Sequence, residues 1–477
     1  MALRRLLRNF FSVSAMRLIT AAFSFVLFMW LARSWGAELL GEFSTLFTYF
    51  MFILQLPLLG LHIVLARDIA TRTEQQGECF SNALAIALPV SLILMVIVGL
   101  IGQTIYPDNM HKAFWLVGLS SIPMAFVVAA EAVLTGRESM HVIAMVNIIE
   151  TVARVGLCLI LVALGFGLTA LFVAFFAAKL LAVVLYWQRG HLGRDFQLGS
   201  IAWPHIFTYL RKSPMFFGIL ILSVGIGRFD FIFLSIFSSM REVGMYSAPF
   251  KIYEMGLMVP SVITLVLFPM FARAFSDSRP AFDQMYATMF QMTFLIGLPS
   301  VVLFAAMADF VVPFIFGAEY AESALVLQIL AFAILFIAMD QVLTVVVLAG
   351  HREDLELKIL SVSFVVYMAL LVSLIPALGY LGAAVATLVT TCFKFFLRYF
   401  WVSKVMAMPT AIQLLFKPML AGIGMVAALL LTHYWLGLIP ALLVGLVMYV
   451  SCSLLLKVLS REQVLGFRAL LARPRSP

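Results

Sequence analysis

The chain has 477 residues, of which 64% are hydrophobic and only 11% are charged, and its formal net charge is +8. Because a soluble globular domain carries about 25% charged residues, this composition excludes an ordinary soluble protein. Apolar segments of about 20 residues recur along the chain, and each could cross the roughly 30 Å hydrocarbon core of a bilayer. The sequence therefore predicts an all-α, polytopic membrane protein.

Turn signals divide the apolar sequence into about fourteen predicted membrane helices. The first follows a basic N-terminal segment. Its length, its Arg17 and the lack of a convincing cleavage site favour a membrane helix over a cleaved signal peptide. The cysteine spacings indicate neither a disulfide framework nor a metal site. The predicted helices span residues 11–33, 42–66, 80–105, 113–135, 140–164, 168–188, 214–238, 245–271, 284–308, 323–349, 357–376, 381–403, 412–433 and 436–458.

The Lys and Arg residues of the loops are distributed unequally between the two sides of the membrane. If both termini are cytoplasmic, that side carries nearly all of the loop cations, and the outer side keeps only Arg33, Lys112 and Arg241. Because loops rich in Lys and Arg stay in the cytoplasm, we predict that both termini and the 189–213 loop are cytoplasmic. This distribution accounts for the net positive charge without a nucleic-acid partner.

Three short motifs recur in the same order, each displaced by six predicted helices. LTGRE at 134–138 returns as LAGHRE at 348–353, ALGF at 163–166 as ALGY at 377–380, and GEFS at 41–44 as GMYS at 244–247. An even displacement preserves helix orientation, as in the parallel repeats of transporters. We expect two pseudo-symmetric six-helix lobes: an N-lobe at 1–190 (helices 1–6), a cytoplasmic linker at 191–213, a C-lobe at 214–404 (helices 7–12), and helices 13–14 with a basic cytoplasmic tail at 405–477.

Ionisable residues inside the predicted helices are the main functional signal, because a charge at membrane depth is costly and usually faces a partner or a wet cavity. Glu150 and Arg154 stand four residues apart and can pair, whereas Arg228 and Asp230, two apart, point to different sides of a helix. Lys251 and Glu254 stand three apart and can also pair.

We predict that six cations line a central cavity that binds an anionic group such as phosphate or pyrophosphate: Arg17, Arg154, Lys179, Arg228, Lys251 and Lys394. Four carboxylates are candidates for coupling or ion pairing: Asp230, Asp340, Glu150 and Glu254. The structural alternative is that these charges form inter-helix salt bridges that fix packing. The sequence contains no catalytic constellation and no metal motif, so we expect neither an enzyme nor a bound cofactor, and coupling to an H⁺ or Na⁺ gradient is left open.

Diffuse motifs along nearly the whole chain carry a family resemblance. They are LAR at 31–33, GEFS at 41–44, Gly60 followed by ARDIA at 66–70, RFD at 228–230, VGMY at 243–246, FGAEY at 316–320 and GYLGAA at 379–384. With these motifs the chain resembles the polysaccharide-transporter branch of the multidrug/oligosaccharidyl-lipid/polysaccharide (MOP) exporter superfamily, which includes Wzx-type O-antigen flippases.

The resemblance implies a MATE-like fold and a role in polysaccharide or lipopolysaccharide O-antigen biosynthesis. The expected activity is alternating-access flipping of an undecaprenyl-pyrophosphate-linked oligosaccharide across the bacterial inner (plasma) membrane, with the lipid bilayer and other polysaccharide assembly proteins as partners. One alternative is a cation-coupled multidrug exporter, which would favour acidic residues in the lobes. Another is a structural membrane subunit of a polysaccharide synthase complex.

Overall fold

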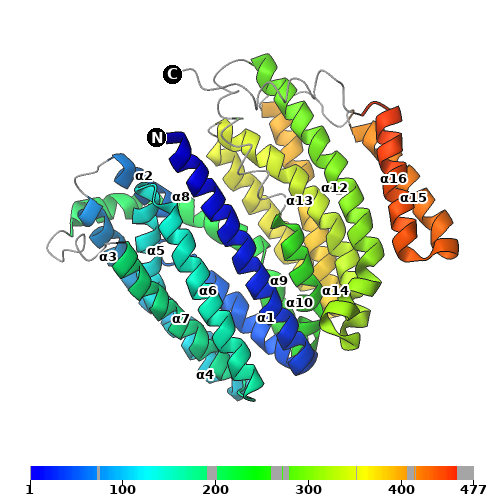
Figure 1. Cartoon of the computed structure of the whole chain (residues 1–477). Coiled ribbons are helices and arrows are strands. Elements are labelled where there is room, and N and C mark those ends of the chain that lie inside the picture. Colours follow the sequence, from blue (N-terminus) through cyan, green and yellow to red (C-terminus); the bar gives the residue numbers. More distant parts are fainter. Residues whose placement is uncertain are drawn as a thin grey trace. The chain divides into compact units, whose positions relative to one another are not determined.

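The computed structural model describes residues 2–71, 76–190, 201–258, 271, 279–350, 352–405, 413 and 415–458, and its regular elements in these ranges are helices (Figure 1). Ten helices in this part of the chain are long and apolar enough to cross a membrane, or eleven if the bent pair Trp203–Arg211 and Ser213–Ile226 is one span. The chain is therefore a multi-pass membrane protein, and the predicted all-α fold class is confirmed.

Two helices are far longer than one membrane crossing. These are α1 (Ala2–Ile53) with 52 residues and α14 (Glu353–Val405) with 53. At about 1.5 Å per residue each would measure nearly 80 Å, against roughly 30 Å of hydrocarbon. Each is broken at a glycine with positive φ, Gly36 (φ 73°) and Gly379 (φ 55°), a conformation that glycine adopts at little cost. Helix α14 thus contains the predicted spans 357–376 and 381–403, and α1 contains the predicted span 11–33 and the first part of the span 42–66.

The structure shortens or divides several of the predicted spans. The span 42–66 ends as a helix at Ile53, and turns over residues 54–61 precede α2 (His62–Thr71); Pro57 in this stretch lacks the N–H that would continue the helix. The span 113–135 is divided at Ser120 into α4 (Asp108–Leu119) and α5 (Ser121–Gly136). The span 245–271 is described only to residue 258 and at residue 271.

The chain forms two compact units. Unit 1 comprises Met1–Lys251, Ile315–Tyr320 and Leu371–Ala383, and unit 2 comprises Ile252–Phe314, Ala321–Leu370 and Ala384–Pro477. The predicted lobes at 1–190 and 214–404 stay a prediction. Residues 191–200 of the predicted linker and residues 459–477 of the predicted basic tail lie outside the described residues.

Unit 1 is organised around α6, which packs against both α1 and α7. Helices α1 and α7 also meet through aromatic rings: the Phe43 ring lies 5.8 Å from that of Phe172 and 6.1 Å from that of Phe175. Besides α6 (Met140–Ala163) and α7 (Leu168–Arg189), this unit contains α3 (Gln76–Ile105), α8 (Trp203–Ile226), α9 (Phe229–Phe237) and α10 (Met240–Gly256), of which the last continues past Lys251.

Two glycines in unit 1 bring backbones into direct contact. A Cβ atom at Gly41 would collide with the carbonyl group of Met240, and a Cβ atom at Gly244 would collide with the carbonyl group of Ala37. Gly41 and Gly244 open the repeated motifs GEFS and GMYS, and Ala37 and Met240 each lie four residues before them. The contact is therefore reciprocal between the two sequence repeats.

Unit 2 contains α12 (Arg279–Phe316) up to Phe314, the 3₁₀ helix η4 (Ala318–Ser323) from Ala321 onward, α13 (Ala324–Ala349), most of α14, α15 (Phe416–Leu436) and α16 (Leu438–Leu455). The last two form a hairpin, drawn in red in Figure 1, that turns at Gly437 (φ 80°). The Tyr449 hydroxyl donates a hydrogen bond of 2.8 Å to the carbonyl of Leu295, so the hairpin packs on α12.

Candidate functional site

The unit 1 cluster consists of Glu150, Arg154 and Lys179. Helix α6 supplies Glu150 and Arg154 one turn apart, and α7 supplies Lys179. Arg154 Nε lies 3.3 Å, and Lys179 Nζ 3.4 Å, from the same Glu150 oxygen, Oε1. All three residues are buried, with exposures of 3%, 9% and 6%. Formal charges of two cations and one carboxylate leave this cluster with a surplus of one positive charge.

Aromatic rings surround the surplus charge. The guanidinium carbon of Arg154 lies 4.7 Å from the ring centroid of Phe175, and Lys179 Nζ lies 5.9 Å from that of Phe50. Both distances fall within the range in which a ring face attracts a cation. In the described part of the chain, Glu150 is the one carboxylate that forms ion pairs with these two cations. The aromatic faces therefore stabilise a buried charge that carboxylates leave uncompensated.

The unit 2 cluster consists of Asp340, Glu356, Lys394 and Arg398. Asp340 lies on α13, and the other three lie on α14, whose two limbs run on either side of Gly379. Arg398 is 1% exposed. It forms ion pairs with Asp340 and, at 2.7 Å, with Glu356, while Lys394 Nζ lies 3.2 Å from Asp340 Oδ2. Two cations face two carboxylates, so the formal charge of this cluster is zero.

The six predicted cations occupy different surroundings. Arg154, Lys179 and Lys394 belong to the two clusters. Arg228 and Lys251 are half-buried beside aromatic rings, with Arg228 Cζ 5.6 Å from the centroid of Phe250 and Lys251 Nζ 5.6 Å from that of Phe28. Arg17 is exposed on α1. The predicted convergence of all six on one cavity stays a prediction.

The predicted carboxylates are also placed by the structure. Asp230 is 1% exposed in the first turn of α9, where it accepts hydrogen bonds from the Tyr246 hydroxyl at 2.6 Å and from the Phe231 N–H at 2.9 Å. The predicted helix 214–238 breaks just before it, at Gly227 and Arg228, because glycine weakens a helix interior. Glu150 and Asp340 are cluster residues, and Glu254 is half-buried on α10.

Two buried residues escaped the sequence prediction. The predicted topology places Arg398 among the cytoplasmic loop cations, and no sequence pattern singles out Glu356, yet these two residues form the tight 2.7 Å pair of the unit 2 cluster. One signal was available: Arg398 lies four residues after Lys394, on the same face of a helix. A second polar contact was also missed, since Glu131 Oε1 accepts hydrogen bonds from the Tyr186 hydroxyl at 2.7 Å and from Asn147 Nδ2 at 2.9 Å.

The fold is shared with solved transporters. A lipid II flippase, MurJ, in an inward closed conformation gives a TM-score of 0.78 at 12% identity, covering 93% of this chain and 98% of that chain. An inward-facing multidrug resistance MATE family transporter of the MOP superfamily gives 0.66 at 14% identity, covering 82% of this chain and 96% of that chain. The MATE-like architecture implied by the sequence resemblance is therefore confirmed.

Sequence comparison gives the family. The chain is 24% identical over 382 residues to the probable low-salt glycan biosynthesis flippase Agl15 of Haloferax volcanii, a match that covers 77% of each protein. The model of the polysaccharide biosynthesis protein family matches residues 30–325, which is more than half of the 477 residues. The chain therefore belongs to the family of polysaccharide biosynthesis proteins.

Proposed function

We propose that this protein is a flippase that moves a lipid-linked oligosaccharide from the inner to the outer leaflet of the bacterial inner membrane. The substrate is an undecaprenyl-pyrophosphate-linked glycan, and the protein acts by alternating access. The family and the flippase relative support a role in glycan transfer. The observation that carries the proposal is the buried positive surplus of the unit 1 cluster.

The geometry of this cluster suits an anionic headgroup. Both ion pairs, at 3.3 and 3.4 Å, are longer than the 2.7–2.9 Å typical of charge-assisted hydrogen bonds. A guanidinium has five N–H donors and an ammonium has three, so one shared carboxylate oxygen leaves most of these donors available. Phosphate oxygens bind strongly to such groups. We therefore assign the headgroup-binding role to Arg154 and Lys179, with Arg228, Lys251, Lys394 and Arg17 as further cations of the path.

Release of the headgroup on the outer side requires that its affinity change during the cycle. Asp230, held by the Tyr246 hydroxyl and by a backbone N–H, is our first candidate for a group whose protonation couples this change to an H⁺ or Na⁺ gradient. Asp340 is the second, but its ion pairs with Arg398 and Lys394 favour a structural role. Glu150 and Glu254 complete the set of coupling candidates.

Reconstitution tests the proposal. Purified protein is inserted into liposomes that contain a fluorescent undecaprenyl-pyrophosphate oligosaccharide, and an impermeant glycosidase reports how much glycan reaches the opposite leaflet. We expect transfer above that of protein-free liposomes, and loss of transfer in Arg154→Met. Equal cleavage with and without protein would contradict flipping. Export of a cationic dye such as ethidium, without glycan transfer, would support the multidrug-exporter alternative.

A further inference from the structure

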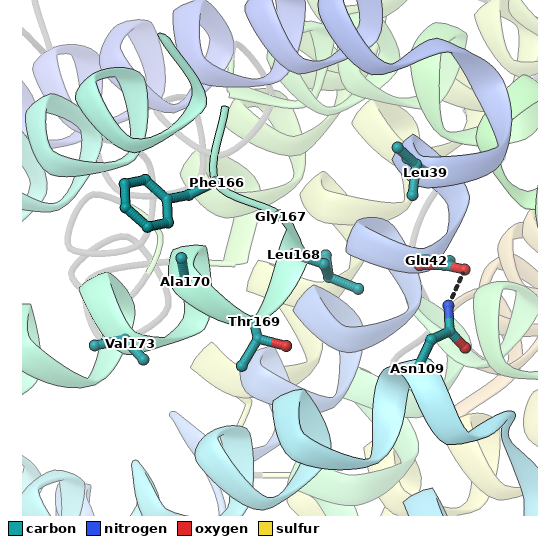
Figure 2. A pocket seen from close by; sticks show the side chains of 9 residues that line it. All are labelled: Leu39, Glu42, Asn109, Phe166, Gly167, Leu168, Thr169, Ala170 and Val173. Atoms are coloured by element: carbon teal, nitrogen blue, oxygen red, sulfur yellow. Dashed lines mark hydrogen bonds between the residues drawn. The ribbon is translucent and has the colours of Figure 1, made fainter. Parts of the chain in front are cut away.

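A pocket in unit 1 is lined by none of the residues of the ion clusters. It has a volume of about 570 Å³, within the range of small-molecule sites, which are mostly apolar with a few converging polar groups. In Figure 2, Glu42 and Asn109 stand on one side and Phe166, Ala170 and Val173 on the other. We call it the Glu42 pocket; its lining is Leu39, Glu42, Asn109, Phe166, Gly167, Leu168, Thr169, Ala170 and Val173.

A carboxylate–amide pair supplies the acceptors of the Glu42 pocket. Glu42 is only 8% exposed, and its Oε1 accepts a 2.8 Å hydrogen bond from Asn109 Nδ2 (Figure 2). A carboxylate can accept about four hydrogen bonds and an amide oxygen two. Glu42 Oε2 and Asn109 Oδ1 therefore keep acceptor capacity for a ligand that donates hydrogen bonds.

The start of α7 supplies the donors. Helix α7 begins at Leu168 after Gly167, and no side chain caps it. The Ala170 N–H donates to the Gly167 carbonyl at 3.1 Å, so the N–H groups of Leu168 and Thr169 are the ones without an acceptor in this helix. Just after the breaks at Gly379 and Gly36, a carboxylate accepts a hydrogen bond from a backbone N–H. The Tyr380 N–H donates to Glu242 Oε2 at 3.0 Å, and the Ala37 N–H donates to Glu319 Oε1 at 3.3 Å.

The sequence repeats explain why the pocket is open. ALGF at 163–166 corresponds to ALGY at 377–380, and Leu39, two residues before Gly41, corresponds to Glu242, two residues before Gly244. Where the second repeat places the Glu242 carboxylate against a helix start, the first repeat has an apolar side chain that cannot accept a hydrogen bond. The Phe166 N–H, which corresponds to that of Tyr380, donates instead to the Leu161 carbonyl at 2.9 Å. A bound molecule in the pocket can therefore accept hydrogen bonds from the N–H groups of Leu168 and Thr169 at the start of α7.

These groups select the chemistry of that molecule. An anion would suit the helix start but would be repelled by Glu42, and a cation would suit Glu42 but would oppose the helix N-terminus, which favours negative charge. A neutral polyol both donates and accepts hydrogen bonds, and the apolar side chains of Leu39, Phe166 and Val173 fit the C–H faces of a ring. We propose that the Glu42 pocket binds a neutral pyranose ring of the glycan. A role of this pocket in transport rests on the proposed flippase function, whereas the binding of a sugar to the pocket does not.

Ligand-observed NMR tests the proposal directly. Saturation-transfer spectra are recorded for the full-length protein in nanodiscs, which avoid the competing sugars of maltoside detergents. The probes are methyl β-D-glucopyranoside, N-acetylglucosamine and L-rhamnose, with glycerol and inorganic phosphate as comparisons. We expect saturation of ring protons by at least one saccharide, no such signal from glycerol, and no displacement of the sugar by phosphate.

Gly167→Leu is the blocking variant, because a Cβ at Gly167 meets no atom within 4 Å and its φ of −83° suits any residue. Gly156→Leu is the matched control: the space beside Gly156 on α6 is equally open, and it does not line the pocket. Loss of one hydrogen bond or more should weaken binding by at least about fivefold in Gly167→Leu and leave Gly156→Leu unchanged.

Three results would overturn the proposal: saccharide signals no stronger than those of glycerol, equal signals in the two glycine variants, or displacement of the sugar by phosphate. The measurement needs neither a lipid substrate nor an ion gradient. If the protein binds sugars but does not flip lipid-linked glycan, only the proposed flippase function is contradicted. If it flips lipid-linked glycan but binds none of the sugars, only the proposed sugar binding in the Glu42 pocket is contradicted.

Discussion

The unit 1 and unit 2 clusters both bury a lysine and an arginine among apolar helices, but they balance these charges differently. In unit 1 the two cations share one oxygen of Glu150 at 3.3 and 3.4 Å. In unit 2 two carboxylates face two cations, and the Arg398–Glu356 pair closes to 2.7 Å. In the unit 1 cluster most hydrogen-bond donors of the cations stay available to a ligand. In the unit 2 cluster these donors connect α13 to both limbs of α14.

The difference separates a structural role from a binding role. A tight and neutral buried pair is costly to break, since removal of one partner leaves an uncompensated charge. A positively charged cluster with long ion pairs contributes less to stability, and it has more hydrogen-bond donors available for an anion. Stability measurements should therefore be most sensitive to the unit 2 cluster, and transport measurements most sensitive to the unit 1 cluster.

The largest expected effect is on stability, in Arg398→Met. This change leaves Asp340 and Glu356 buried without the arginine that joins them, and should lower the free energy of unfolding by about 3–5 kcal/mol. Titration with SDS in mixed micelles measures it. Arg352→Gln is the control, because Arg352 forms its 3.0 Å pair with Asp354 at the exposed surface, and its unfolding curve should match that of the wild type. Equal curves for both variants would contradict a structural role for the unit 2 cluster.

The next effect is on transport, in Lys179→Met. The change leaves Glu150 and Arg154 as a neutral pair, so the headgroup loses a charged hydrogen bond of about 1.5–3 kcal/mol, and flipping per folded protein should fall at least about tenfold. The reconstituted glycosidase assay measures it. Lys394→Met is the matched variant, since it removes the lysine of the unit 2 cluster. It should lower stability more than Lys179→Met and flipping less. A larger loss of stability in Lys179→Met, or a larger loss of flipping in Lys394→Met, would contradict the assignment of a binding role to unit 1 and a structural role to unit 2.

The smallest expected effect on stability is that of Asp230→Asn. Phe231 and Tyr246 donate to different oxygens of Asp230. The asparagine oxygen can still accept from the Phe231 N–H, and its NH2 group can donate to the Tyr246 hydroxyl oxygen, so the free energy of unfolding should change by about 1 kcal/mol or less. The dependence of flipping on an H⁺ or Na⁺ gradient should nevertheless disappear, because the amide cannot be protonated. Tyr246→Phe, which keeps the carboxylate, should retain that dependence. If Asp230→Asn flips substrate with unchanged gradient dependence, Asp230 is structural.

The sequence was sufficient for the features that follow from local chemistry. Hydropathy located most of the spans and separated 11–33 from 42–66 and 357–376 from 381–403, where the structure breaks α1 at Gly36 and α14 at Gly379. The spacing of Glu150 and Arg154 indicated their pair. Ion pairs between residues far apart in the sequence were harder to predict. Lys179 reaches Glu150 from α7, and Arg398 reaches Glu356 from the other limb of α14. Such contacts depend on how helices pack, which spacing within one helix does not determine.

The reciprocal contact at Gly41 and Gly244 has a consequence for the origin of the fold. When residue i meets residue j of a second copy, and j meets i, the interface has the two-fold geometry of a homodimer. Here Gly41 meets Met240 while Gly244 meets Ala37, so a single polypeptide preserves that geometry between its own repeats. A gene duplication that fused two identical subunits would leave this arrangement. Gly41→Ala and Gly244→Ala both force apart the backbones of α1 and α10. The difference between their effects on the free energy of unfolding therefore measures how far the two repeats have diverged.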